Sequence, residues 1–210
     1  AKQLQRQVFI NDRVKTMNES VYYNVDDIHS AINQNRKIRF QYYKWDINKK
    51  LVPRHGGVWF VVSPWVLMWD DENYYMIALD DRDHSIKHYR VDKMMHISVE
   101  KTVRDGREEF KNFDIAEYSK ATFGMYQGKR TRVTIEFEDY MCGVFIDRFG
   151  KDISFRKVVD GRSELNVDIN VSPQFFGWLF SLGDDVKVTG PEEVVEQIRD
   201  VAQKLIKKYE

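Results

Sequence analysis

The feature that most restricts the fold of this chain is a series of short, strand-like segments between residues 36 and 100. In the first segment Ile38, Phe40 and Tyr42 alternate with polar residues, which is typical of a strand with one buried and one exposed face. Pro64 interrupts the second segment (58–69) and predicts a bend or bulge, because proline cannot donate to a sheet ladder. The other segments are 73–80, 85–91 and 94–100. Five short strands separated by turns predict a small, closed or half-closed β-barrel.

The second half of the chain follows a different order of elements. The dipeptide Asp160–Gly161 predicts a tight hairpin, and Pro173 and Pro191 are placed to open helices. The expected elements are a strand (130–138), a helix (139–150), a hairpin around 160–161, a helix from 173, a strand (184–190) and a long terminal helix (191–209). This β-α-β-β-α-β order predicts a ferredoxin-like unit with one additional helix.

The predicted fold class is therefore α+β, with a small β-barrel followed by a ferredoxin-like βαββαβ unit. Asp26 or Asp27 is placed to cap a short amphipathic helix over residues 25–36. A short alternating segment around Val8 and Ile10 indicates one further strand before it. The predicted division is a connector (1–24), a barrel domain (25–103), a linker with a helix (104–128) and a ferredoxin-like extension (129–210).

The composition argues against several classes of protein. The net charge is zero, so bulk charge does not attract a polyanion, and Cys142 is the single cysteine, which excludes an internal disulfide framework. No apolar run is long enough to span a membrane and no signal peptide opens the chain, so we expect a cytoplasmic protein. The sequence shows no nucleophile motif, phosphate-binding glycine loop or set of metal ligands. We therefore expect no enzyme activity, no metal and no cofactor.

Charged residues on the outer faces of the predicted strands indicate a binding function. Tyr89 and Val91 are expected to fill the barrel, which turns His88 and Arg90 outward, and Arg39 likewise lies opposite a core face. Arginine is suited to bidentate binding of phosphate, and aromatic rings nearby offer stacking surfaces. The alternative is that these are ordinary surface residues, with Arg90 in a salt bridge to Asp92 or Asp80.

The order of motifs in residues 25–103 resembles a WYL domain. The family's Trp-Tyr-Leu tripeptide aligns with Tyr74-Tyr75-Met76, its upstream Pro-x-x-Leu with Pro64–Leu67, and its downstream motif with Tyr89–Met94, where Arg90 and Asp92 match and Lys93 replaces arginine. The resemblance implies an Sm-like or SH3-like barrel, a bacterial transcriptional regulator and a nucleotide or nucleic-acid ligand. Residues 105–210 resemble the linker and C-terminal extension that usually follow.

Six residues are candidates for the ligand site. Tyr75, Arg90 and Lys93 are carried over by motif, whereas Arg39, Ser63 and His88 come from the face argument. Arg90 and Arg39 would hold an anion, Tyr75 or His88 would stack or donate, and Lys93 would add charge. This hypothesis requires the arginines to gather beside aromatic rings without carboxylate neighbours. For Tyr75 the alternative is a core tyrosine whose hydroxyl bonds the backbone.

The start of the chain departs from the family pattern. The chain begins at Ala1 without an initiator methionine, and no helix-turn-helix is expected before residue 25. We therefore expect the sensor part of a regulator, a homodimer that reaches DNA through a missing N-terminal domain. Two other hypotheses stay open: direct, weakly specific binding of single-stranded nucleic acid by the barrel, and a purely structural role in dimerisation.

Overall fold

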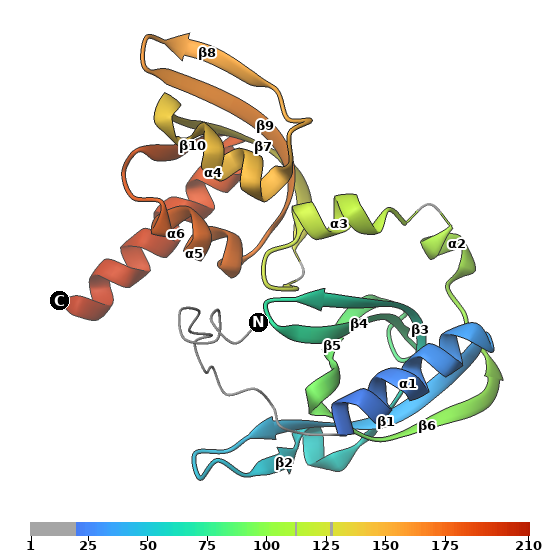
Figure 1. Cartoon of the computed structure of the whole chain (residues 1–210). Helices are drawn as coiled ribbons and strands as arrows, with labels where there is room; N and C mark the ends of the chain where they lie inside the picture. The colour runs from blue at the N-terminus through green and yellow to red at the C-terminus, as the bar shows by residue number, and fades with distance from the viewer. Residues whose placement is uncertain (1–19, 112, 127) are drawn as a thin grey trace, which may run out of the picture. The chain divides into compact units, whose positions relative to one another are not determined.

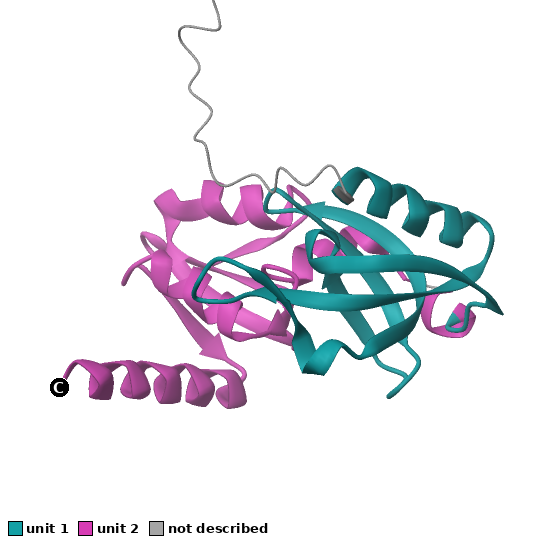
Figure 2. Cartoon of the chain, turned by 90° about the horizontal axis from the view of Figure 1, so that it is seen from below, with its two compact units in different colours: residues 1–106 teal, residues 107–210 magenta. Residues whose placement is uncertain are grey.

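The structure is a computed structural model that describes residues 20–111, 113–126 and 128–210. Within it the chain divides into two compact units, residues 1–106 and residues 107–210 (Figure 2). The strand expected around Val8 and Ile10 lies outside the described residues. Each unit has a sheet and a hydrophobic core of its own.

Unit 1 is mostly antiparallel sheet (Figure 1). Its elements are α1 (Ser20–Asn33), β1 (Arg36–Trp45), β2 (Leu51–Pro53), the 3₁₀ helix η2 (Arg54–Gly57), β3 (Trp59–Asp70), β4 (Asn73–Asp80), β5 (Ile86–Arg90), the 3₁₀ helix η3 (Val91–Lys93) and β6 (Met94–Val103). The strand order is β2-β1-β3-β4-β5, and β6 also pairs with β1. The five expected strands are thus confirmed, and the short strand β2 is an addition.

The prediction of a closed barrel is wrong. Strands β5 and β6, which would have to meet to close the sheet, are not hydrogen-bonded to each other in the described residues. The 3₁₀ helix η3 occupies the connection between them and ends the ladder of β5 at Arg90. The domain is therefore an open antiparallel sheet that curves around its core.

Two local predictions for unit 1 can be compared with the structure. Pro64 does not break the strand: β3 continues through it, and its register against β4 shifts between Pro64 and Val66, which is the predicted bulge. Helix α1 begins at Ser20 rather than at residue 25 and ends at Asn33, before the positive φ of Asn35. The capping positions Asp26 and Asp27 therefore lie inside the helix.

The core of unit 1 follows the predicted alternation. Ile38 and Phe40 of β1 are fully buried, and Tyr89 and Val91 lie inside as expected. The rings of Phe40 and Phe60 stack, with 5.6 Å between their centroids, and Tyr89 meets Phe40 edge to face at 5.1 Å. Helix α1 covers this core with Ile28 and Ala31. The outward direction of Arg90 follows from this packing.

Unit 2 has the predicted order of elements. These are α2 (Arg107–Phe110), α3 (Ile115–Ala121), β7 (Lys129–Glu138), the 3₁₀ helix η4 (Asp139–Met141), α4 (Cys142–Phe149), β8 (Phe155–Val159), β9 (Arg162–Val171), α5 (Pro173–Ser181), β10 (Val186–Gly190) and α6 (Glu192–Tyr209). The antiparallel sheet has the strand order β10-β7-β9-β8. Its core joins Ile135 and Phe137 of β7 to Phe145 of α4 and Phe175 of α5. Asp114 caps α3 and Ser172 caps α5, each through its side-chain oxygen.

Candidate functional site

The most distinctive charged group in unit 1 is centred on Asp92, in η3 at the end of β5. The Asp92 side chain is only 6 % exposed, and it accepts two hydrogen bonds from Arg90: Nε to Oδ1 at 3.0 Å and Nη2 to Oδ2 at 2.9 Å. Arg90 Nη2 also donates to Asn73 Oδ1 at 2.7 Å. Lys93 Nζ lies 3.1 Å from Asp92 Oδ2. We call Asn73, Arg90, Asp92 and Lys93 the Asp92 cluster.

The Asp92 cluster carries more positive than negative charge. Two cations share one carboxylate, and Arg54 adds a third cation nearby, with its guanidinium 5.7 Å from the centre of the Tyr42 ring. Burial by itself would raise the pKa of Asp92, but hydrogen bonds and charge from Arg90 and Lys93 lower that pKa below its ordinary value. The carboxylate is therefore ionised at neutral pH. Within the cluster two cations thus share one carboxylate. Burial raises the pKa of the neighbouring Tyr75, and two further carboxylates, Asp70 and Asp71, lie close enough to raise that pKa as well.

Arg90 keeps donors that can reach a ligand. Its side chain is 37 % exposed, and Nη1 makes no hydrogen bond to any residue that the structure describes. The hydrogen bond to Asp92 raises the pKa of Arg90, so the guanidinium stays charged. Its backbone N–H donates to the Tyr42 hydroxyl at 3.1 Å, which fixes the start of η3 against the core.

Aromatic rings border the Asp92 cluster on two sides. Tyr75 of β4 is the direct cross-strand partner of Arg90, and burial raises the pKa of its half-buried hydroxyl. The Lys93 ammonium lies 4.9 Å from the centre of the Trp45 ring, which is half exposed. The three residues carried over by motif, Tyr75, Arg90 and Lys93, thus lie around one carboxylate.

Arg39 belongs to a second group, on the outer face of β1. Its guanidinium lies 5.1 Å from the centre of the Trp59 ring and 3.2 Å from Glu100. His96 lies beside both Trp59 and Tyr43, with centroid distances of 6.5 and 6.4 Å. We call Arg39, Tyr43, Trp59 and His96 the Trp59 face. All four side chains are half-exposed or exposed, and together they place a cation next to aromatic rings.

The predicted convergence of Arg39 with Arg90 is not observed. Arg39 pairs in register with Val61 near the start of β3, whereas Tyr75, the partner of Arg90, pairs with Met68 near its end. The expectation that the arginines lack carboxylate neighbours is also wrong, since Arg90 bonds Asp92 and Arg39 bonds Glu100. The half-buried guanidinium of Arg90 needs a partner, and the sequence supplies Asp92 two residues away.

Ser63 and His88 have other surroundings. Ser63 is fully buried, and its hydroxyl accepts the backbone N–H of Asp105 at 2.8 Å. It therefore fixes the segment that leaves unit 1, and within the described part of the chain it makes no hydrogen bond to the Asp92 cluster. His88 lies on β5 in register with Ile77, on the same side of the strand as Arg90.

Sequence reasoning missed several residues of these groups. Asn73 contacts Arg90 and Trp45 contacts Lys93 from other strands, and nothing in the spacing of the chain shows that they meet. Trp59 could have been found, because it stands in register with Gln41, two residues from Arg39 on the outer face of β1. Among the described residues no group of three or more His, Cys, Asp or Glu side chains could hold a metal ion. None of the described helices is long and apolar enough to cross a membrane.

Family models match two parts of the chain: a WYL domain matches residues 23–99 and a WCX domain matches residues 129–206. No curated protein matches the sequence. Among solved structures the chain is similar to proteasome accessory factor B/C (PafBC) of Arthrobacter aurescens, with 15 % sequence identity and a TM-score of 0.37. That match covers 88 % of this chain and 26 % of the other, so the chain spans about a quarter of that protein's length. WYL and WCX domains are regulator-type, non-enzymatic domains. The chain thus contains a WYL domain followed by a WCX domain.

Proposed function

We propose that this chain is the ligand-sensing region of a bacterial transcriptional regulator, and that the Asp92 cluster binds a nucleotide-like or other anionic ligand. The observation that carries the proposal is the sharing of one buried carboxylate by Arg90 and Lys93. An anion can add to such a group without displacing Asp92, because one positive charge is in excess. Phosphate would accept from Arg90 Nη1 and from Lys93, and a base would stack on the exposed Trp45 ring.

The same cluster has a direct connection to helix α1. The buried side-chain amide of Asn24 donates to Val91 O at 3.2 Å and to Met94 O at 2.9 Å, so it holds both ends of η3. A ligand that binds Arg90 and Lys93 would shift η3. The hydrogen bonds of Asn24 would transmit that shift to α1. An attached DNA-binding domain that precedes α1 would be repositioned in this way.

Further parts of the proposal concern architecture and assembly. We infer that unit 1 is an open relative of the Sm-like fold and that unit 2 is ferredoxin-like, because its strands stand in the spatial order fourth, first, third, second. We also propose that the regulator acts as a homodimer in the cytoplasm and reaches its operator through a further, N-terminal domain.

A thermal-shift panel tests the ligand. Nucleoside mono-, di- and triphosphates, cyclic dinucleotides and a short single-stranded oligonucleotide are added to the chain and to the variants Arg90→Gln and Lys93→Gln. At least one compound should raise the melting temperature, and both variants should lose most of that shift. Lys101→Gln, an exposed change on β6, is the control and should keep it. No shift with any compound, or equal shifts in all variants, would contradict the proposal.

The Trp59 face favours a second function, weakly specific binding of single-stranded nucleic acid. Arg39 over Trp59, with His96 and Tyr43 beside them, offers rings for stacking and a cation for phosphate. This function predicts that Trp59→Ala weakens binding of a single-stranded oligonucleotide about tenfold and that affinity falls steeply with salt. Arg90→Gln should have little effect on it, which separates the two functions.

A further inference from the structure

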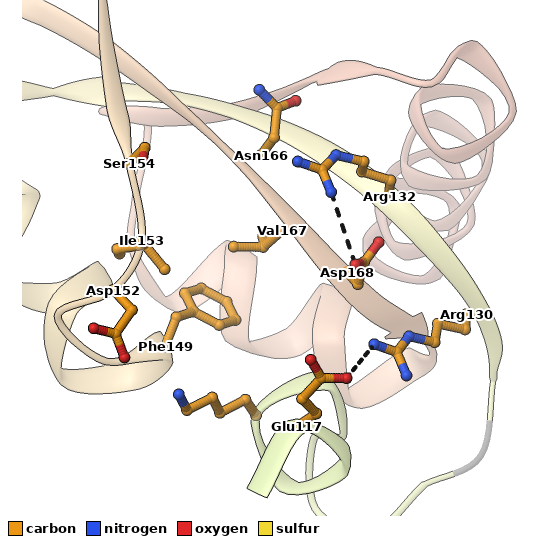
Figure 3. A pocket seen from close by; sticks show the side chains of 11 residues that line it. Glu117, Arg130, Arg132, Phe149, Asp152, Ile153, Ser154, Asn166, Val167 and Asp168 are labelled. Atoms are coloured by element: carbon orange, nitrogen blue, oxygen red, sulfur yellow. Dashed lines mark hydrogen bonds and ion pairs between the residues drawn. The ribbon is translucent and has the colours of Figure 1, made fainter. Parts of the chain in front are cut away.

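Unit 2 contains a pocket of about 440 Å³, well separated in sequence from the groups described in unit 1. Figure 3 shows its lining, which comes from helix α3, strands β7 and β9, and the turn after α4. Its volume lies within the range of small-molecule sites. All of its residues belong to unit 2, so the pocket is complete within that unit.

The pocket has an apolar floor and a charged rim. Phe149, Ile153 and Val167 form the floor. In Figure 3 Asp152 lies on one side of it, whereas Arg132 lies on the other side. Such a lining suits a ligand with an apolar group over the floor and polar groups at the rim.

The charges of the rim balance, but they are not all paired. Three basic and three acidic side chains line the pocket: Lys120, Arg130, Arg132, Glu117, Asp152 and Asp168. Arg130 pairs with Glu117 at 3.2 Å and Arg132 with Asp168 at 3.9 Å. Lys120 and Asp152 have no hydrogen bond or ion pair to the residues that the structure describes. The rim thus offers one ammonium and one carboxylate to a ligand.

These two unpaired charges lie at the same turn. Lys120 Nζ is 3.2 Å from the position that a Cβ atom would take on Gly150, two residues before Asp152. Gly150 has a positive φ of 91° and so accommodates both the turn and the close approach of Lys120. The absence of a side chain at Gly150 therefore leaves room for Lys120 at the rim.

We propose that this pocket binds a small zwitterion with an apolar side group, an α-amino acid or a dipeptide. The carboxylate of the ligand would bind Lys120, its ammonium group would bind Asp152, and its side group would cover Phe149, Ile153 and Val167. A simple anion would face three carboxylates and a simple cation three basic groups, whereas a zwitterion meets both charges with opposite partners. The site goes beyond the proposed function, because it lies in unit 2 and uses different residues.

A ligand in the pocket would also hold helix α3 on the sheet. The end of α3 is already fixed there, because Asn170 of β9 donates to the Thr122 hydroxyl at 2.8 Å and Arg148 donates to the Thr122 carbonyl at 2.7 Å. Lys120 is one turn or less from that anchor. Binding should therefore slow amide hydrogen exchange in residues 115–121.

Calorimetric titration with four probes tests the chemistry of the ligand. L-leucine and L-leucyl-L-leucine are zwitterions of different length, isocaproate lacks the ammonium group of leucine, and isoamylamine lacks its carboxylate. At least one zwitterion should bind, and both half-ligands should bind at least about tenfold more weakly. The stronger of the two zwitterions identifies an amino acid or a dipeptide as the ligand. Binding of neither zwitterion, or equal binding of a half-ligand, would overturn the proposal.

Charge-removing variants locate the site. Asp152→Asn and Lys120→Gln should each weaken zwitterion binding about tenfold or more, and they should remove the slowing of exchange in residues 115–121. Asp147→Asn and Lys151→Gln are matched controls, since both residues are exposed and neither lines the pocket. Equal losses in the controls would rule out this pocket. Arg90→Gln should leave zwitterion binding unchanged, so failure here is distinguishable from failure of the proposed function.

Discussion

The two units use buried carboxylates differently. In unit 1 Asp80 and Asp92 are buried, and each is shared by two cations: Arg82 and Lys87 hold the first, Arg90 and Lys93 the second. In unit 2 the buried Glu164 has a single cationic partner among the described residues, the mostly exposed Arg156.

The difference decides where an anion can be added. One cation to one carboxylate is already balanced, and an exposed pair of this kind contributes little to stability. Two cations around one buried carboxylate leave a positive charge in excess, and removal of the carboxylate leaves them repelling each other. The charge around Asp92 is therefore both important for stability and available to an anionic ligand, whereas at Asp80 the second cation, Lys87, is also paired with Asp83.

The largest expected effect is that of Asp80→Asn. Asp80 is fully buried and accepts hydrogen bonds from Arg82, Lys87 and the Tyr89 hydroxyl, the last at 2.7 Å. Loss of its charge should lower the free energy of unfolding of unit 1 by about 2–4 kcal/mol. Hydrogen exchange measured along the chain should show this loss in unit 1 and no change in unit 2.

The comparison in unit 2 is Glu193→Gln, which removes an exposed ion pair with Lys129. It should cost less than about 0.5 kcal/mol. Equal effects of Asp80→Asn and Glu193→Gln would remove the contrast between the units.

Acid should also separate the units. Burial by itself would raise the pKa of Asp80, but hydrogen bonds from Arg82, Lys87 and Tyr89 outweigh it, and the pKa in the folded protein lies well below the ordinary value. The same direction holds for Asp92. Stabilisation by a carboxyl group with a lowered pKa is complete above the unfolded value of about 4 and is lost as the pH falls toward the folded value.

Unit 1 should consequently lose exchange protection as the pH falls below about 4, and Asp80→Asn should make that loss shallower. Exchange measured at a series of acid pH values checks this. A pH dependence that Asp80→Asn does not alter would show that another group is responsible.

A smaller effect is expected for Ser63→Ala. The variant leaves the Asp105 N–H without its partner, and should lower the stability of unit 1 by about 1–2 kcal/mol. It should not change ligand affinity, because the hydroxyl faces the exit segment and not the Asp92 cluster. If Ser63→Ala lowered ligand affinity but left the stability of unit 1 unchanged, Ser63 would belong to the ligand site.

Much of the fold could be predicted from the sequence because its strands alternate cleanly. The alternation of Ile38, Phe40 and Tyr42 and the hairpin at Asp160–Gly161 give elements that the structure contains. Closure of the sheet could not be predicted, since it depends on whether β5 meets β6, and three residues of 3₁₀ helix separate them. The sequence predicts a start of α1 that is too late, because Asp26 and Asp27 resemble caps but belong to its exposed face.

The contacts of the candidate site also divide into those that could be predicted from the sequence and those that could not. Alternation correctly turns Arg90 outward, and the pair with Asp92 is the alternative that the sequence itself offered. The distance between Arg39 and Arg90 along β3 depends on strand register, which the spacing of residues within one strand does not contain. Contacts within one segment could be predicted from the sequence. Contacts between strands, such as Asn73 to Arg90 or Trp45 to Lys93, depend on how the strands pair in the sheet.

The central claim is that the excess positive charge around Asp92 binds an anionic ligand. The most direct measurement is calorimetric titration of the compound that stabilises the chain most, using wild type, Arg90→Gln and Lys101→Gln. We expect Arg90→Gln to weaken binding at least about tenfold while Lys101→Gln binds as wild type. Equal affinity of wild type and Arg90→Gln would contradict the claim.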